Sequence, residues 1–263
     1  MDKRKRDGFL DWGIDGIIAG RNAVIEALDA KTPLDKIFIA KGETDGTLAH
    51  IASRAREMGC VVVDADKRKL ETLAGQRAHQ GIVAVCAVTN YVEIEDLLEI
   101  AQKKGESPFI IICDEITDPH NLGAIIRTAE GAGAHGVIIP KRRSAGIGPI
   151  VHKTSAGAVS HLPVARVANL PSTIRYLQKV GVWVYGTSST AVKTLWETDF
   201  SGAIAIVIGS EGAGMRRLVS ECCDFQVSIP MQGKISSLNA SVSASLIMYE
   251  IVRQKTEIRM RSK

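Results

Sequence analysis

The sequence predicts an α/β protein, with a parallel sheet covered by helices on both faces and a smaller αβ unit in front of it. The 263 residues are 45% hydrophobic and 24% charged, enough for one large or two modest hydrophobic cores. Beyond residue 108, near-continuous Ile/Val runs alternate with helical patterns, as in parallel strands that are buried on both faces. These runs are 109–116, 136–140, 182–188, 203–210 and 225–230.

The first ninety residues alternate between helical and strand-like patterns. The helical patterns are 20–28, 47–59 and 66–74, and the strand patterns are 36–40, 60–65 and 80–88. We therefore expect residues 1–90 to form a small αβ domain.

Residues 91–107 are charged and helical in pattern, and they end in "KKGESP". Gly105, Ser107 and Pro108 interrupt regular structure. We therefore expect a linker at 91–107, followed by a second domain at 108–263.

Composition disfavours several classes of protein. No run approaches eighteen apolar residues, and the N-terminal "MDKRKRDGFLDWG" lacks the apolar core of a signal peptide. We therefore expect a cytoplasmic protein with no membrane partner. The five cysteines show no CxxC spacing, which favours reduced thiols, and the six histidines show no paired spacing, so we expect no metal site.

Basic residues gather in three places, although the net charge is only +4. These places are 3–6, 141–143 and 253–263. Solvated termini and a solvated loop would explain each cluster singly. Together the clusters favour an anionic partner such as nucleic acid.

The stretch "GAGAHG" (131–136) matches the G-x-G-x-x-G dinucleotide fingerprint. That fingerprint binds a pyrophosphate only where it follows a strand and opens a helix. Here a helix precedes it and a strand follows. We therefore interpret it as the glycine turn at the end of a helix and not as a cofactor site.

The stretch "DEITDPHNLGAIIRTAEGAG" (114–133) leads from a buried strand into a helix, with Asn121 where a helix cap is expected. The i, i+3, i+4, i+7 spacing predicts one buried stripe, made of Leu122, Ile125, Ile126 and Ala129. Arg127 lies roughly 150° from the centre of that stripe. It therefore faces either bulk water or a cleft at the carboxyl edge of the sheet, where α/β proteins bind ligands.

Two more glycine-bearing turns follow buried strands, "AIVIGSEGAGM" (205–215) and "IPMQGKISSLN" (229–239). Gly209, Gly212 and Gly214 would let the backbone approach a ligand closely. An ordinary left-handed turn explains any one of these sequences, but three polar turns after buried strands indicate a shared site. None has the GxxxxGK[ST] spacing of a P-loop, which disfavours a nucleoside triphosphate.

At this point the chain resembles a known family. "NLGAIIRT", "IGSEGAGM" and "IPMQGKISSLNASVSAS" are similar, in order and rough spacing, to the three motifs of the SpoU (TrmH-like) RNA ribose 2′-O-methyltransferases, over about residues 108–254. "GRNAVIEAL" and "HQGIVAVCA" resemble the family's small substrate-binding domain, which is related to ribosomal proteins that bind kinked RNA. The two domains together are most similar to bacterial enzymes that methylate a guanosine of 23S rRNA in the P loop of the peptidyl-transferase centre.

The resemblance implies a deep trefoil knot in the C-terminal domain, an exception to unknotted topology, because in this family the C-terminal segment passes through an earlier loop. It also implies a homodimer. A threaded helix that packs on its surroundings and on a second subunit favours small side chains, and "NASVSAS" (239–245) supplies them. Their hydroxyls can bond to the helix's own carbonyls. Periodicity alone predicts an ordinary doubly wound sheet.

The resemblance further implies S-adenosylmethionine as the cofactor. Carried over by position, the family's motifs place its methionine and adenosine parts against the backbone near Gly209, Ile229, Met231 and Leu238, with Thr187 beside the adenosine. Glycine and backbone groups suit this ligand, because the adenine edge pairs with amide donors and acceptors.

Arg127 resembles the family's essential arginine, often assigned as the base for the ribose 2′-hydroxyl. A guanidinium is normally protonated in proteins. An equally physical role is to grip the RNA phosphate and stabilise developing alkoxide charge. The remaining polar motif positions are expected to orient Arg127 and the ribose, partly across a dimer interface; they are Asn121, Glu211, Ser237 and Asn239.

RNA, and not DNA or a membrane, is therefore the expected partner, and phosphate neutralisation by residues 141–143 would be salt-dependent. Two alternatives stay open. One is a different RNA target, such as tRNA or another rRNA loop. The other is a non-catalytic RNA-binding or ribosome-assembly protein, which would have no need of the polar motif residues that this chain carries.

Overall fold

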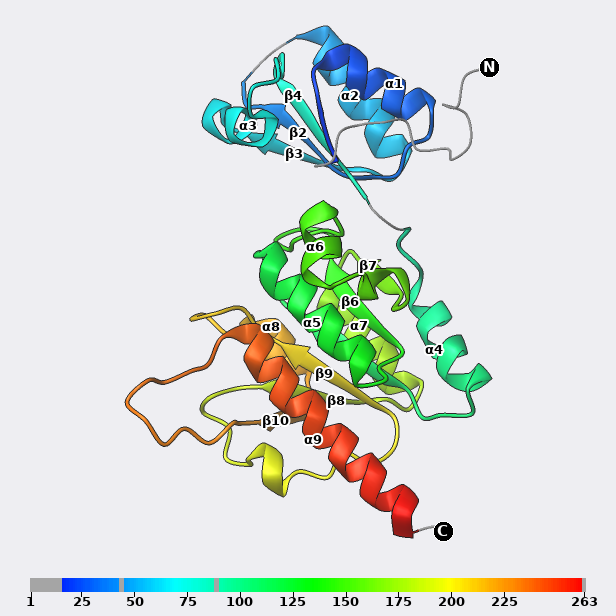
Figure 1. Cartoon of the computed structure of the whole chain (residues 1–263), viewed down its shortest axis with the longest axis vertical. Coiled ribbons are helices and arrows are strands. Elements are labelled where there is room, and N and C mark those ends of the chain that lie inside the picture. Colours follow the sequence, from blue (N-terminus) through cyan, green and yellow to red (C-terminus); the bar gives the residue numbers. More distant parts are fainter. Residues whose placement is uncertain (1–15, 43–44, 88–89, 262–263) are drawn as a thin grey trace. The chain divides into compact units, whose positions relative to one another are not determined.

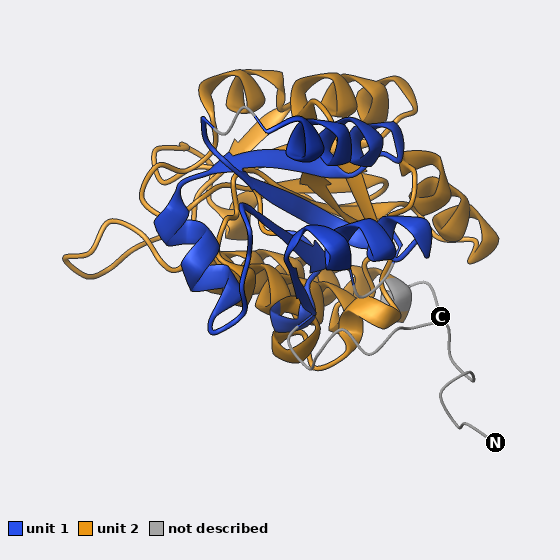
Figure 2. Ribbon diagram, turned by 90° about the horizontal axis from the view of Figure 1, so that it is seen from above, with its two compact units in different colours: residues 1–90, 146–150 blue, residues 91–145, 151–263 orange. Residues whose placement is uncertain are grey.

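The computed structural model describes residues 16–42, 45–87 and 90–261. The basic cluster at 3–6 lies outside this range, as do the last two residues of the cluster at 253–263. The chain divides into two compact units, residues 1–90 with 146–150, and residues 91–145 with 151–263 (Figure 2).

The first unit contains a four-stranded sheet in the order β1-β4-β2-β3 (Figure 1). β2 and β3 are parallel, and β4 is antiparallel to both β1 and β2. The strands are β1 (Ile17–Ala19), β2 (Leu34–Ala40), β3 (Val61–Ala65) and β4 (Ile82–Cys86), and the helices are α1 (Arg21–Asp29), α2 (Gly46–Glu57) and α3 (Lys67–Ala74). The six predicted elements are confirmed. The three-residue β1 was missed because it is too short to show a period.

The sheet of the first unit is covered on both faces. Ile37 and Ile39 of β2 belong to the cluster formed with α1 and α2. Phe38, on the opposite face, packs in a second cluster with Leu70 of α3. Successive side chains of a strand point to opposite faces, so a near-continuous apolar β2 serves both layers.

The second unit contains a six-stranded, entirely parallel sheet in the order β10-β8-β9-β5-β6-β7. Its strands are β5 (Phe109–Cys113), β6 (Gly136–Pro140), β7 (Val164–Val167), β8 (Trp183–Thr187), β9 (Ile204–Ile208) and β10 (Phe225–Val227). Every side chain of β5, β6 and β9 is buried. This confirms the predicted parallel sheet with helices on both faces; β7 was not predicted.

Helices flank this sheet on both sides (Figure 1). They are α4 (Ile94–Lys103), α5 (Pro119–Gly131), α6 (Pro149–Thr154), α7 (Leu170–Lys179), α8 (Arg217–Cys222) and α9 (Ala240–Arg261), with short 3₁₀ turns at Ala158–Ser160 and Leu195–Glu197. Side chains of α4, α7 and α8 share one apolar cluster with the sheet. α5 and α9 pack against each other on the other side.

The expectation that residues 91–107 form only a linker needs correction. Leu97 and Ala101 of α4 are fully buried, and Leu97 belongs to the core of the second unit. Val92 also forms a parallel bridge with Ala165 of β7. The charged face of α4 suggested a connector, but its narrow apolar stripe attaches the segment to the sheet.

The start of α5 also differs from the prediction. Asp118, and not Asn121, caps the helix: its side chain accepts a hydrogen bond from the N–H of His120 at 3.0 Å. Asn121 lies in the first turn. The buried stripe and the exposed Arg127 are confirmed. The glycine turn at 131–136 is confirmed too, because α5 ends at Gly131 and Gly133 has a φ of 73°.

Small residues at the start of α9 allow close packing on α5. Ala244 is fully buried, and the hydroxyl of Ser245 lies 3.1 Å from that of Thr128. Ser245 also donates to the carbonyl of Ser241 at 2.8 Å, the predicted bond back to the helix. The segment after β10 runs beside the earlier loop that follows β8, with the N–H of Leu195 donating to the carbonyl of Ser228.

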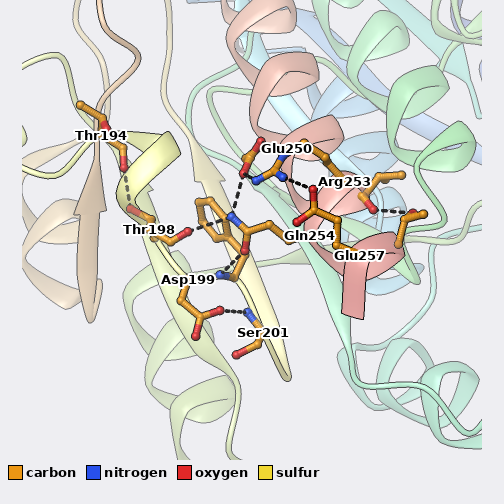
Figure 3. A network of polar contacts seen from close by, with 11 residues as sticks. Thr194, Thr198, Asp199, Ser201, Glu250, Arg253, Gln254 and Glu257 are labelled. Carbon is orange, nitrogen blue, oxygen red and sulfur yellow. Dashed lines mark hydrogen bonds and ion pairs between the residues drawn. The ribbon is translucent and has the colours of Figure 1, made fainter. Parts of the chain in front are cut away.

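A polar network joins the middle of α9 to that same loop (Figure 3). The amide of Gln254 donates to the carbonyl of Thr198 and accepts from the N–H of Phe200, both at 2.9 Å. Glu250, 5% exposed, accepts two bonds from Arg253. These bonds hold the pKa of Glu250 below its usual value. The network fixes α9 to the loop through hydrogen bonds.

The sequence favours reduced thiols, and all five cysteines are free in the structure. Burial raises the pKa of Cys113 to about 12, so its thiol stays protonated. None of the helices in the described ranges is long and apolar enough to cross a bilayer.

His135, just before β6, makes the stability of the second unit depend on pH. Its ring is fully buried, Nδ1 accepts the N–H of Phe109 at 3.0 Å, and Nε2 lies 3.3 Å from Glu106. Burial, and then the charge of Lys104, lowers the pKa of His135 below its ordinary value of 6.5. The unfolded chain therefore takes up this proton first, and stability is lost as the pH falls below 6.5 towards the lower folded-state pKa.

We expect the melting temperature to fall more steeply between about pH 7.5 and 5.5 in the wild type than in His135→Asn. Asparagine does not titrate, yet its Oδ1 can still accept from the N–H of Phe109. Differential scanning fluorimetry across this range measures both slopes. The exposed His50→Asn is the control and should keep the wild-type slope. Equal slopes for wild type and His135→Asn would contradict the assignment.

Candidate active site

A cavity opens at the carboxyl ends of β8, β9 and β10. Its wall includes all five residues predicted to hold the cofactor, together with Glu211 and Ser237. The five are Thr187, Gly209, Ile229, Met231 and Leu238. We call this space the cofactor cavity. Because parallel strands end at one edge of a sheet, three segments distant in sequence meet there.

Gly209 makes the turn after β9 possible. A Cβ at this position would lie 2.3 Å from the backbone carbon of Gly214 and 2.3 Å from the nitrogen of Met215. The turn closes on itself through two hydrogen bonds between Ser210 and Gly214, at 2.9 and 3.0 Å. Residue 209 must therefore be glycine for the turn to keep this shape.

The three glycine-bearing turns converge, as predicted, beside this cavity. Asn121, in the first turn of α5, donates through Nδ2 to Glu211 Oε1 at 3.0 Å. Asn239 donates through Nδ2 to Asn121 Oδ1 at 2.9 Å and also to Glu211 Oε1. We call these three residues the polar cluster. The polar cluster lies at the ends of the neighbouring strands β5 and β9. After β5 the chain continues into α5 on one side of the sheet, and after β9 it continues into α8 on the other side. Such a switch point is where α/β proteins bind ligands.

Asn239 also begins α9. Its Oδ1 accepts the N–H groups of Ser241 at 2.9 Å and Val242 at 3.2 Å, the geometry of a helix N-cap. The cap orients the side chain with its oxygen towards α9 and its amide nitrogen towards Glu211. One residue thus couples the position of the helix to that of the polar cluster.

We expect Asn239→Ala to lower the free energy of unfolding by about 0.5–2 kcal/mol, because α9 loses its cap. Asn239→Ser should recover most of that loss, since a serine hydroxyl can cap the helix but cannot span the polar cluster. Urea unfolding of the three proteins measures the difference. A serine variant as unstable as the alanine variant would assign the stabilisation to the bonds with Asn121 and Glu211 instead.

Two predicted site residues stand apart from the polar cluster. Ser237 is exposed and lines the cofactor cavity. Arg127 lies six residues beyond Asn121 on α5, about 9 Å along the axis and 120° around it. Arg127 is exposed and makes no ion pair with the residues that the structure describes. Its guanidinium is free to meet a ligand or a second subunit.

A buried ion pair that was not predicted from the sequence lies next to the site. Asp114, directly after β5, is fully buried and accepts from the backbone N–H of Arg216 at 2.7 Å and from its Nε at 2.8 Å. This pair anchors the end of the turn that starts at Gly209. A carboxylate directly after an all-apolar strand was the signal that could have identified it.

In the first unit, the start of α1 lies beside the turn at 75–81. Arg21 donates from Nε to the carbonyl of Gln80 at 3.1 Å, and its guanidinium pairs with Asp45 at 2.5 Å. Much of the donor capacity of Arg21 serves the fold, which leaves the exposed Asn22 as the freer group.

Comparisons with known proteins now bear on this architecture. Residues 108–249 match the SpoU rRNA methylase family, and residues 17–92 match the RNA 2′-O ribose methyltransferase substrate-binding domain. The chain therefore belongs to the SpoU family of RNA methyltransferases. YacO of Bacillus subtilis, assigned to the TrmH family of tRNA/rRNA methyltransferases, is 45% identical over 242 residues, which cover 92% of this chain and 96% of YacO. A Staphylococcus aureus protein with the same family assignment is 43% identical over 244 residues, 93% of this chain and 98% of its own.

Solved structures agree with this fold. The SpoU methyltransferase AviRb of Streptomyces viridochromogenes, in complex with AdoMet, has a TM-score of 0.58 and 25% identity, covering 92% of this chain and 90% of its own. An AdoMet-bound rRNA methyltransferase of Sinorhizobium meliloti has a TM-score of 0.57 and 24% identity, over 91% and 87% of the two chains. The two-part architecture is therefore that of the SpoU methyltransferases.

Proposed function

We propose that this chain transfers a methyl group from S-adenosylmethionine to the ribose 2′-hydroxyl of a guanosine in 23S rRNA, with the P loop of the peptidyl-transferase centre as the favoured target. The observation that carries the proposal is the cofactor cavity with the polar cluster at its edge. A binding protein without chemistry has no need of a carboxylate held by two asparagine amides beside such a cavity. An rRNA substrate places the activity in the cytoplasm.

The residues of the cofactor cavity fit S-adenosylmethionine. Gly209 would clash with its own turn if it carried a side chain, so the backbone here is bare and close to any ligand. Apolar Ile229, Met231 and Leu238 suit the adenine faces, and the neighbouring amide groups suit its edge. Thr187 offers a hydroxyl from the end of β8. When bound, the cofactor supplies an electrophilic methyl group.

Arg127 serves the ribose in this proposal, as the base or as the group that grips the neighbouring phosphate and stabilises charge on the attacking oxygen. Asn121, Glu211, Ser237 and Asn239 orient the ribose and Arg127. Because Arg127 is not bonded to the polar cluster of its own chain, we assign its partner cluster to a second subunit.

An exposed apolar face supports the homodimer. Val242, Leu246 and Tyr249 of α9 are 46%, 38% and 55% exposed, and Trp196 beside them is 56% exposed. Soluble chains rarely leave such a contiguous face open, and a second copy would cover it. α9 packs along α5, which carries Arg127, so this contact would bring Arg127 close to the partner.

We assign RNA affinity and choice of target to residues 1–90, and chemistry to residues 108–263, with 91–107 attached to the latter through α4. The described part of the first unit carries basic side chains, and none of its residues lines the cofactor cavity. The start of α1 and the turn at 75–81 are its RNA-contacting surface.

The proposal is tested by mapping ribose methylation in rRNA and tRNA from cells with and without this protein. Loss of one 2′-O-methylguanosine in the P loop, restored by adding the purified protein and S-adenosylmethionine to unmodified 23S rRNA, is the expected result. Loss of a methyl group from tRNA or from another rRNA loop would move the target but keep the chemistry. Unchanged maps, with no transfer in vitro, would favour a non-catalytic RNA-binding or ribosome-assembly role.

A further inference from the structure

A second cavity, of about 400 Å³, lies at the carboxyl edge of the same sheet beyond β6 and β7. Four arginines line it, together with the start of α7; the residues are Arg142, Arg143, Asn169, Leu170, Arg216 and Arg217. None of the described residues in its wall is acidic. We call it the arginine pocket, and this concentration of positive charge selects an anion.

Arg216 is held in position from behind. Its Nε donates to the fully buried Asp114 at 2.8 Å and lies 3.6 Å from Glu115. Its two terminal amines make no hydrogen bond within the described part of the chain, although a guanidinium carries five donors. The buried carboxylate thus fixes the guanidinium and leaves one edge of it for a ligand.

Arg143 is held in a similar way, at some cost in backbone strain. It pairs with Glu115 at 3.2 Å. Arg143 and Glu115 both have left-handed backbone, with φ of 54° and 58°. Left-handed backbone is strained for a residue other than glycine, and such strain gathers at ligand sites.

The remaining cations are accessible. Arg142 is exposed and has no ion pair within the described residues. Arg217 is 86% exposed, and its one ion pair within the described residues is with Glu221, one turn away on α8. The ten-residue helix α7, capped by Asn169, points its positive end at the pocket. Planar guanidinium groups and a helix N-terminus match the oxygens of a phosphate.

The arginine pocket and the cofactor cavity share one loop. Residues 209–215 line the cofactor cavity, and the next residues, 216–219, line the arginine pocket. We propose that the arginine pocket binds a backbone phosphate of the RNA substrate and holds the strand beside the cofactor cavity. The inference takes its ligand class from the proposed function.

The test is binding of a fluorescein-labelled single-stranded RNA oligonucleotide to the full chain, by fluorescence anisotropy over a range of salt concentrations. Arg142→Gln/Arg217→Gln removes two cations of the pocket and spares the pair between Arg216 and Asp114. Arg175→Gln/Lys103→Gln is matched in charge, because Arg175 is an exposed residue of α7 and Lys103 pairs one turn away with Glu99. Methyl transfer to 23S rRNA and tRNA transcripts is measured in parallel.

We expect the pocket variant to bind RNA on the order of tenfold more weakly at ~0.1 M salt, and its log–log salt slope to be shallower by about 1.4, or about 0.7 per lost contact. The control should change neither value by more than a small fraction of this. Equal RNA affinities and equal salt slopes for the two variants would refute the proposal that the arginine pocket binds an RNA phosphate. A third outcome separates the two proposals. If the pocket variant binds RNA more weakly but the wild type transfers no methyl group to either RNA, phosphate binding by the pocket is supported and the proposed function is refuted.

Discussion

Replacing Gly209 by alanine should remove cofactor binding and destabilise the second unit. The added Cβ would lie 2.3 Å from the backbone of Gly214 and Met215, where no flexible side chain can give way. The turn must open, which breaks its bonds between Ser210 and Gly214 and moves Glu211 away from Asn121. Overpacking of this kind costs about 1–3 kcal/mol in well-packed interiors.

Calorimetry with S-adenosylmethionine and thermal unfolding together measure this effect. We expect at least a tenfold loss of affinity for the cofactor and a lower melting temperature. Gly233→Ala is the matched control, since it lies in the segment before α9, its Cβ would meet no atom within 4 Å, and its φ is ordinary. Wild-type affinity in Gly209→Ala would show that the cofactor does not contact this turn.

Periodicity was enough to predict most of the fold. Long Ile/Val runs identified five strands of the parallel sheet, because a strand buried on both faces has no polar positions to interrupt it. Two short strands were missed. β1 has three residues and β7 has four, which is too short for a periodic pattern of apolar residues to be recognised. The packing of α4 was also missed, because two fully buried residues, Leu97 and Ala101, are a weak signal among charges.

The site was only partly predictable. Glycine after a buried strand marks a turn at the ligand-binding edge, so the positions of Gly209 and Glu211 followed from local sequence. That Asn121 and Asn239 contact each other could not follow from spacing, because 118 residues separate them and only the sheet order joins their turns. Asn121 was wrongly assigned as the cap of α5. Asp118, three residues earlier, caps a helix equally well, and the sequence alone does not distinguish the two.

The arginine pocket could not have been predicted from charge runs. The sequence shows only the short cluster at 141–143, and Arg216 and Arg217 follow a glycine turn more than seventy residues later. The parallel sheet brings them together, since β6 lies next to β5, whose end holds Arg216 through Asp114. The composition of a segment shows its charge, but it does not show which distant segments the sheet order places beside it.

Arg127→Ala should abolish methyl transfer while leaving the fold and cofactor affinity nearly intact. Arg127 is exposed, it has no ion pair in the described chain, and it does not line the cofactor cavity. Surface substitutions of this kind usually change stability by less than about 0.5 kcal/mol. Loss of a group that stabilises charge on the attacking oxygen costs about 100- to 1,000-fold in rate. We therefore expect transfer to fall at least 100-fold with an unchanged melting temperature.

Single-turnover transfer to unmodified 23S rRNA, with calorimetry and thermal unfolding beside it, measures this expectation. The control is Arg175→Ala, because Arg175 is another exposed arginine on a helix of the same unit. This variant should transfer the methyl group at the wild-type rate. Arg127→Lys separates the two roles of Arg127: it keeps the charge and loses the planar fork, so substantial activity would identify a phosphate anchor. An Arg127→Ala variant that unfolds would refute the helix-face assignment, and one that keeps its activity would refute the catalytic one.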